Sequence, residues 1–163
     1  MPSWSRDGRF IYFSSNRVGG WQVFRHSVET GAELQLTSHG GFNPFESSDG
    51  RTIYFSKFDQ PGIWSMPASG GAESLVLEGK PQVGYWGHWA VTRVGLYLLN
   101  AETEPKPSIE FYHFATGRIT SVLTFEKRPV PLQPSLSTTQ DGKTIYYTQY
   151  QSQSVIKMME TPR

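Results

Sequence analysis

The chain has 163 residues and a formal net charge of +1, because 15 basic residues nearly balance 14 acidic ones. The sequence has no cysteine, no lysine and arginine cluster suited to a phosphate backbone, and no apolar run of the roughly 20 residues that cross a bilayer. We therefore expect no disulfide, no thiolate metal site, no nucleic-acid partner and no membrane partner. The 14% aromatic content, with 16 glycines and 11 prolines, favours short strands and tight turns.

One ten-residue motif recurs along the chain. It reads SRDGRFIYFS at 5–14, SSDGRTIYFS at 47–56 and TQDGKTIYYT at 139–148, with a weaker copy, TRVGLYLLN, at 92–100. The aligned glycines, Gly8, Gly50, Gly95 and Gly142, are 42, 45 and 47 residues apart, a period typical of one propeller blade. Asp-Gly supplies the positive φ of a tight hairpin, and the run that follows is rich in strand formers. Val94 replaces the aspartate in the third copy, which predicts a different hairpin there.

Three further strands accompany each copy of the motif. A short strand precedes it, at 2–5, 43–48, 87–92 and 133–138, and a third follows at 21–31, 62–71, 109–117 and 154–163. A fourth strand is expected at 32–37, 72–77 and 118–125, and the last copy has none. Four strands per period predict an all-β fold, a β-propeller with four blades of four antiparallel strands and an incomplete last blade. We expect one domain over 1–163, with blades at about 1–38, 39–80, 81–127 and 128–163.

The stretch PSWSRDGRFIYFSSNR at 2–17 resembles the TolB-like β-propeller repeat family. The stretches at 40–57 and 84–99 are similar, more narrowly, to the C-terminal propellers of bacterial regulators that begin with a winged-helix DNA-binding domain, which is absent here. The resemblance implies a scaffold that binds a ligand or a protein, with no catalytic residues to carry over, and a chain that is a piece of a longer protein. The opening residues have no secretory signal, so the compartment stays open, with the cytoplasm as the default.

Two aromatic-rich connections, HGGFNPFE at 39–46 and GYWGHWA at 84–90, are the best candidates for a site. Each links the outer strand of one blade to the first strand of the next, and such connections run toward the propeller axis. We expect them to surround the channel mouth and to bind a protein, a peptide or a small molecule. The ligand-binding candidates are Phe42, Phe45, Glu46, Tyr85, Trp86, His88 and Trp89, with Arg17 and Trp21 near the same rim. The alternative is packing between blades, which weighs most for Phe45 and Trp89.

Signals of catalysis and of metal binding are missing from the sequence. The histidines, His26, His39, His88 and His113, are scattered, and turn chemistry explains Asp7, Asp49 and Asp141. No nucleophile elbow or phosphate-binding loop occurs, so we expect no catalytic residue, no metal and no cofactor. A non-catalytic binding or interaction scaffold is the favoured function. The alternatives are a small hydrolase or lyase using Glu46 with His88 or His39, and a purely structural half-propeller.

The incomplete fourth blade predicts self-association. Two chains related by a two-fold axis would close an eight-bladed ring, each supplying what the other lacks. The expected partner is therefore a second copy, in a homodimer, and a closed four-bladed ring ranks second.

Overall fold

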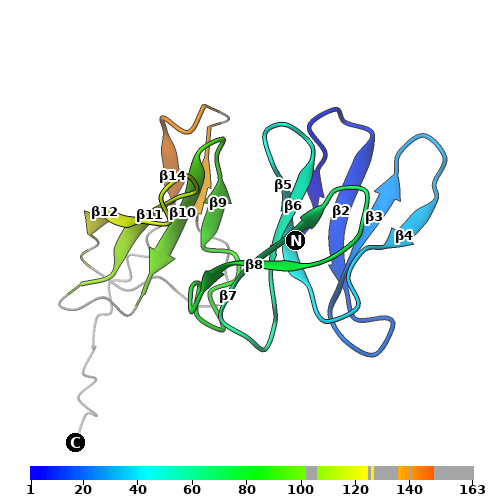
Figure 1. Cartoon of the computed structure of the whole chain (residues 1–163), viewed down its shortest axis with the longest axis horizontal. Helices are drawn as coiled ribbons and strands as arrows, with labels where there is room; N and C mark the ends of the chain where they lie inside the picture. Colours follow the sequence, from blue (N-terminus) through cyan, green and yellow to red (C-terminus); the bar gives the residue numbers. More distant parts are fainter. Residues whose placement is uncertain (102–105, 125, 127–135, 140, 149–163) are drawn as a thin grey trace, which may run out of the picture.

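The computed structural model describes residues 1–101, 106–124, 126, 136–139 and 141–148. The strands of these residues form four antiparallel sheets, in each of which neighbouring strands follow one another in the chain (Figure 1). Blade one contains β1 (Ser3–Trp4), β2 (Phe10–Ser15), β3 (Gln22–Ser27) and β4 (Glu33–Gln35), and blade two contains β5 (Phe42–Glu46), β6 (Thr52–Ser56), β7 (Gly62–Pro67) and β8 (Ser74–Glu78). Blade three contains β9 (Trp89–Val91), β10 (Gly95–Asn100), β11 (Ser108–His113) and β12 (Ile119–Thr124), and blade four contains β13 (Leu136–Thr138) and β14 (Ile145–Tyr147).

The all-β prediction and the order of four strands in each of the first three blades are confirmed. Each sheet falls within the residue range predicted for its blade. The strand predicted at 154–163 lies outside the described residues, so the full extent of blade four stays a prediction.

Side-chain hydrogen bonds build the turn between the first two strands of a blade. The hydroxyl of Ser5 donates to Asp7 Oδ1 at 2.8 Å, and the same oxygen accepts the backbone N–H of Arg9 at 3.0 Å. Gly8 completes the turn with a φ of +72°, which glycine adopts without strain. The backbone hydrogen bond from Arg9, with further bonds from Ser5 and Arg9, lowers the pKa of Asp7 to about 2. Ser47 with Asp49 and Thr139 with Asp141 repeat this arrangement, which confirms that the aspartates are turn builders.

Blade three closes its hairpin differently, as predicted from Val94. The Thr92 N–H donates to the Gly95 carbonyl at 2.9 Å, with two residues between them. In blade one the Ser5 N–H donates to the Phe10 carbonyl, with four residues between them. The Thr92 hydroxyl accepts the N–H groups of Val94 and Gly95, so it replaces the missing aspartate as the hydrogen-bond acceptor of the turn. These turns lie along one edge of the row of sheets, at the top of Figure 1, and the β2–β3 and β6–β7 connections lie at the opposite edge.

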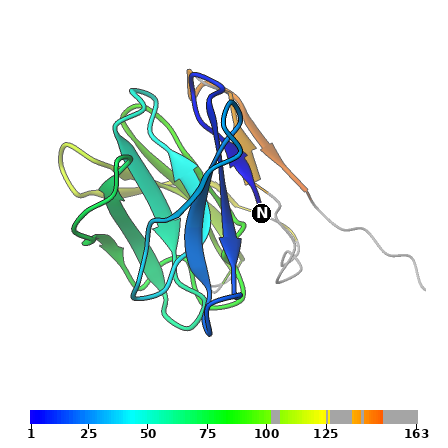
Figure 2. The ribbon, with the colours of Figure 1, turned by 90° about the vertical axis from the view of Figure 1, so that its right-hand side faces the viewer.

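The core consists of side chains packed between sheets that stack one behind another (Figure 2). Ile53 and Phe55 of blade two are fully buried and pack with Tyr12 and Val23 of blade one. A second cluster joins blades two and three. Burying each large apolar side chain contributes about 1.5–3 kcal/mol to folding, so the blades stabilise one another.

Candidate functional site

Four aromatic rings gather at the edge of the blades that lies opposite the Asp-Gly turns, and we call them the aromatic cluster. Its members are Trp21, Phe42, Phe58 and Trp86. Phe58 stacks on Trp86 with ring centroids 4.5 Å apart, and Phe42 meets Trp21 edge to face at 5.0 Å. Phe58 keeps 40% of its surface exposed, whereas Trp86 is buried beneath it. The cluster therefore presents a partly exposed aromatic surface on a buried indole.

Hydrogen bonds fix the position of the aromatic cluster. Asn43 sits at an irregularity of β5 with a φ of +52°, a left-handed conformation that asparagine tolerates better than most residues. Its side-chain amide donates to the Trp86 carbonyl at 2.6 Å, and its backbone N–H donates to the Ser14 hydroxyl at 2.9 Å. The Trp86 indole N–H donates to the Phe58 carbonyl at 3.1 Å. The sequence predicted Phe42, Trp86 and Trp21 around the channel mouth, which stays a prediction, and it did not single out Phe58.

The other aromatic candidates are buried or partly buried. Trp89 is fully buried and meets Phe45 edge to face at 4.8 Å, in the arrangement that the packing alternative predicted. His88 is also fully buried, with its ring 5.2 Å from that of Tyr85. The structure therefore brings Phe42 and Trp86 together, buries His88 and Trp89, and leaves Phe45 partly buried against Trp89.

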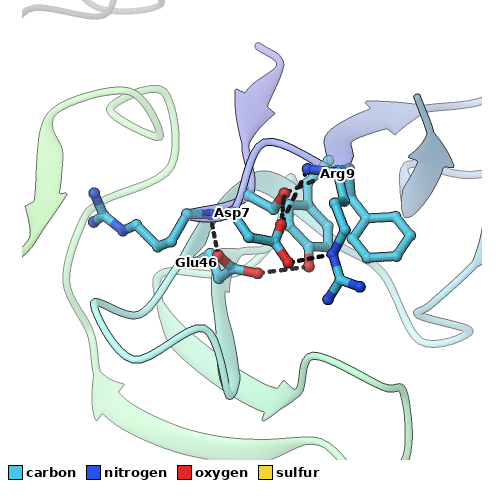
Figure 3. A network of polar contacts seen from close by, with 7 residues as sticks. Asp7, Arg9 and Glu46 are labelled. Carbon is cyan, nitrogen blue, oxygen red and sulfur yellow. Dashed lines mark hydrogen bonds and ion pairs between the residues drawn. The ribbon is translucent and has the colours of Figure 1, made fainter. Parts of the chain in front are cut away.

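Glu46 lies at the other end of β5 from Phe42, where it joins blades one and two (Figure 3). Its carboxylate accepts the Tyr12 hydroxyl at 2.8 Å and the Arg6 backbone N–H at 2.5 Å. Burial raises the pKa of Tyr12, and the hydrogen bond to Glu46 raises it further, so this phenol stays protonated and donates. Glu46 thus serves as a hydrogen-bond acceptor between blades, away from the aromatic cluster.

A groove of about 1090 Å³ at the turn edge was not predicted. Its walls combine hydroxyl groups, Asp49 and Asp141, two cations and the stacked rings of Tyr54 and Phe114, whose centroids are 5.2 Å apart. The cations are Arg93 and Lys143. The groove forms where the turns of blades two, three and four come together, so its residues are spread along the chain. Their shared place in the repeat was the one sequence signal that linked them.

In the part of the chain that the structure describes, no group of three or more histidine, aspartate or glutamate side chains is placed to hold a metal ion. No helix within the same residues is long and apolar enough to cross a membrane.

The chain is similar to known proteins over part of their length, although no family model matches it. A 74-residue segment is 41% identical to the Tol-Pal system protein TolB of Francisella tularensis and covers 42% of this chain and 17% of that protein. The crystal structure of TolB from Acinetobacter baumannii superposes with a TM-score of 0.69 at 23% identity, over 94% of this chain and 38% of that one. An oligogalacturonate lyase from Vibrio parahaemolyticus superposes with a TM-score of 0.60 at 16% identity, over 88% of this chain and 50% of that one.

These findings define the fold of the chain, which is the β-propeller fold seen in TolB. The chain spans less than a fifth of the Francisella TolB and 38% of the Acinetobacter TolB, so it corresponds to an arc of blades within proteins of this fold. The narrower resemblance to the propellers of winged-helix regulators stays a prediction.

Proposed function

We propose that this chain is a non-catalytic binding scaffold, an arc of a TolB-like propeller that contacts a protein or peptide through its aromatic cluster. The observation that carries the proposal is the cluster itself, in which rings from β5 and from three connections meet at one edge and Phe58 stays exposed. Large aromatic side chains contribute much of the energy of protein interfaces, because they bury a large apolar area with few rotatable bonds.

The surroundings of the cluster support this role. The Phe58 ring stacks on Trp86, and the Asn43 amide hydrogen-bonds the Trp86 carbonyl. The exposed Phe58 ring is therefore held in place, and it loses little conformational entropy when a partner binds. A surface that is ordered before binding avoids much of the entropic cost of association. Trp21 and Phe42 extend the apolar area on either side of Phe58.

The proposal includes self-association. Among the described residues, blades one and four each have a neighbouring blade on one side, and a propeller ring needs a neighbour on both sides of every blade. Two copies that supply blades to each other would close the ring as a homodimer.

A small hydrolase or lyase is the second candidate, favoured by the fold shared with the oligogalacturonate lyase. General acid–base catalysis requires groups that reach a substrate. Glu46 instead accepts two hydrogen bonds in the interior, and His88 is fully buried. His39 is exposed and hydrogen-bonds Ser38. These positions favour the scaffold over the enzyme.

A phage-displayed random peptide library, panned on the full chain, tests the proposed surface. Peptides selected on the wild type should bind Phe58→Ser about tenfold more weakly and bind Val94→Ser unchanged. Val94 is the matched control, because it is an exposed apolar residue at the opposite edge. If every selected peptide binds Phe58→Ser as tightly as the wild type, or if none is selected, the aromatic surface is not the binding site.

A turnover screen on esters, phosphoesters and oligogalacturonate tests the enzyme. Turnover by the wild type that disappears in both Glu46→Ala and His39→Ala, with both variants folded, would favour catalysis over the scaffold. We expect no turnover.

A further inference from the structure

Each blade has two chemically distinct sides, which the second strand of the blade defines. A tyrosine occupies one register position of that strand in every blade, and an aliphatic residue precedes it on the opposite face. Strand pairing fixes this equivalence, because Ile11, Ile53, Leu96 and Ile145 each pair with the same position of the first strand. The tyrosines are Tyr12, Tyr54, Tyr97 and Tyr146. We call the two faces the tyrosine side and the aliphatic side.

Within the arc, the tyrosine side of one blade packs on the aliphatic side of the next. Tyr12 is only 1% exposed and donates to Glu46, which lies beside Ile53 on the aliphatic side of blade two. Tyr97 of blade three likewise donates to the Gly142 carbonyl of blade four at 3.2 Å. The repeat therefore specifies which two faces meet at a junction between blades.

Both faces are uncovered at the ends of the arc. Trp4 occupies in blade one the position that Glu46 occupies in blade two, yet Trp4 is 61% exposed and Glu46 only 6%. Tyr146 has the register of Tyr12 and is 59% exposed. Among the described residues no sheet lies beyond blade one, at the right-hand end of Figure 1. Within the described residues, the arc thus presents one uncovered aliphatic side, on blade one, and one uncovered tyrosine side, on blade four.

The outer face of blade one already has the chemistry of a junction. The Arg17 guanidinium lies 4.0 Å from the centroid of the Phe24 ring and pairs with Glu33 at 2.7 Å. In blade two, Lys57 likewise lies over the Trp64 ring and pairs with Glu73 at 3.0 Å. The Lys57 and Glu73 side chains are only 8% and 15% exposed. Because Glu33 neutralises Arg17, a neighbouring blade would bury no unpaired charge here.

We propose that the aliphatic side of blade one docks on the tyrosine side of blade four of a second copy, with Trp4 of one chain against Tyr146 of the other. This pair would take the register of Glu46 and Tyr12, with two aromatic rings in edge or offset contact in place of a carboxylate and a phenol. The contact runs from head to tail, and with a two-fold axis between the copies the second copy makes the same contact in return, which closes the ring. The inference rests on the self-association proposed above and assigns its faces.

Light scattering after size-exclusion chromatography tests the assignment. The wild type should elute at twice the mass of one chain, and Trp4→Asp and Tyr146→Asp should each elute as monomers, because each removes an aromatic contact and brings a charge to both junctions. An equimolar mixture of the two variants should recover dimer, since one junction then has both of its native faces. Val94→Asp is the control for an exposed apolar residue at the turn edge of blade three, and it should remain dimeric.

The outcomes separate this inference from the proposals on which it builds. A monomeric wild type overturns both the self-association and the face assignment and leaves the peptide test of the scaffold standing. A dimer that persists in both aspartate variants keeps the self-association and overturns the assignment.

Cysteine cross-linking gives a second measurement that needs no loss of assembly. Because the natural sequence has no cysteine, Trp4→Cys mixed with Tyr146→Cys leaves a single thiol on each chain. A short bismaleimide should join these two chains, and it should not join Trp4→Cys to Val94→Cys. Equal yields for both mixtures would contradict the proposed contact.

Discussion

Replacing Tyr12 by phenylalanine tests how strongly the hydrogen bond to Glu46 holds blades one and two together. The change removes one hydroxyl and keeps the ring that packs with Val23, Ile53 and Phe55. Hydrogen bonds to charged acceptors contribute about 1.5–3 kcal/mol. Glu46 keeps its bond from the Arg6 N–H, so we expect a loss near the lower end, about 1.5–2 kcal/mol.

Urea unfolding followed by tryptophan fluorescence measures this loss. Tyr146→Phe is the matched control, because it makes the same chemical change at the same register on an exposed ring, and it should stay within about 0.5 kcal/mol of the wild type. In a Glu46→Ala background the cost of Tyr12→Phe should shrink by about 1 kcal/mol or more, since the hydroxyl no longer has its acceptor. Equal effects of Tyr12→Phe and Tyr146→Phe would refute the reasoning.

Three further changes test other parts of the structure. Gly95→Ala should destabilise the chain by about 3 kcal/mol or more, because a Cβ would lie 2.1 Å from the Tyr112 carbonyl, whereas Gly20→Ala, with open space, should cost far less; thermal unfolding compares them. Asn43→Ala should lower the free energy of unfolding by about 2 kcal/mol and Asn43→Gly by less, because glycine keeps the positive φ; urea unfolding measures both. Folding lowers the pKa of Asp7 from 3.8 to about 2, so the contribution of this carboxylate to stability is fully present above pH 4 and is lost as the pH falls toward 2. Asp7→Asn should therefore flatten the fall of the melting temperature between pH 4 and pH 2.

Three results would contradict these expectations. They are equal melting temperatures for the two glycine variants, greater stability of Asn43→Ala than of Asn43→Gly, and an unchanged acid slope in Asp7→Asn.

The blades were predictable from the sequence because their signals are local. An Asp-Gly turn with a hydroxyl residue two positions before the aspartate forms from its own side chains, as Ser5 and Asp7 show. Four strands in each period of 42 to 47 residues also predicted the blades of a propeller. A different hairpin in blade three was predicted from a single residue, Val94, and the structure shows a shorter one.

The candidate site was harder to predict, because strand geometry separates residues that are close in sequence. Phe42 and Glu46 begin and end β5, and four residues of strand at about 3.3 Å each place them about 13 Å apart, at opposite ends of a blade. Phe58 joins the aromatic cluster from a connection that carries no motif. The groove at the turn edge depends on how three blades pack, which no local pattern records. Whether Phe42, Tyr85 and Trp86 bind a ligand stays a prediction.

Two ion pairs, Arg17–Glu33 and Lys57–Glu73, each have their cation over an aromatic ring, and they should respond differently to ionic strength. The Arg17 and Glu33 side chains are 44% and 40% exposed, so added salt should screen their attraction, whereas Lys57 and Glu73 are only 8% and 15% exposed. One chain therefore contains two similar ion pairs, of which Arg17–Glu33 should be sensitive to salt and Lys57–Glu73 resistant to it. If a second copy covers blade one, the Arg17–Glu33 pair should become resistant to salt. The salt dependence of this pair would then detect association without any added label.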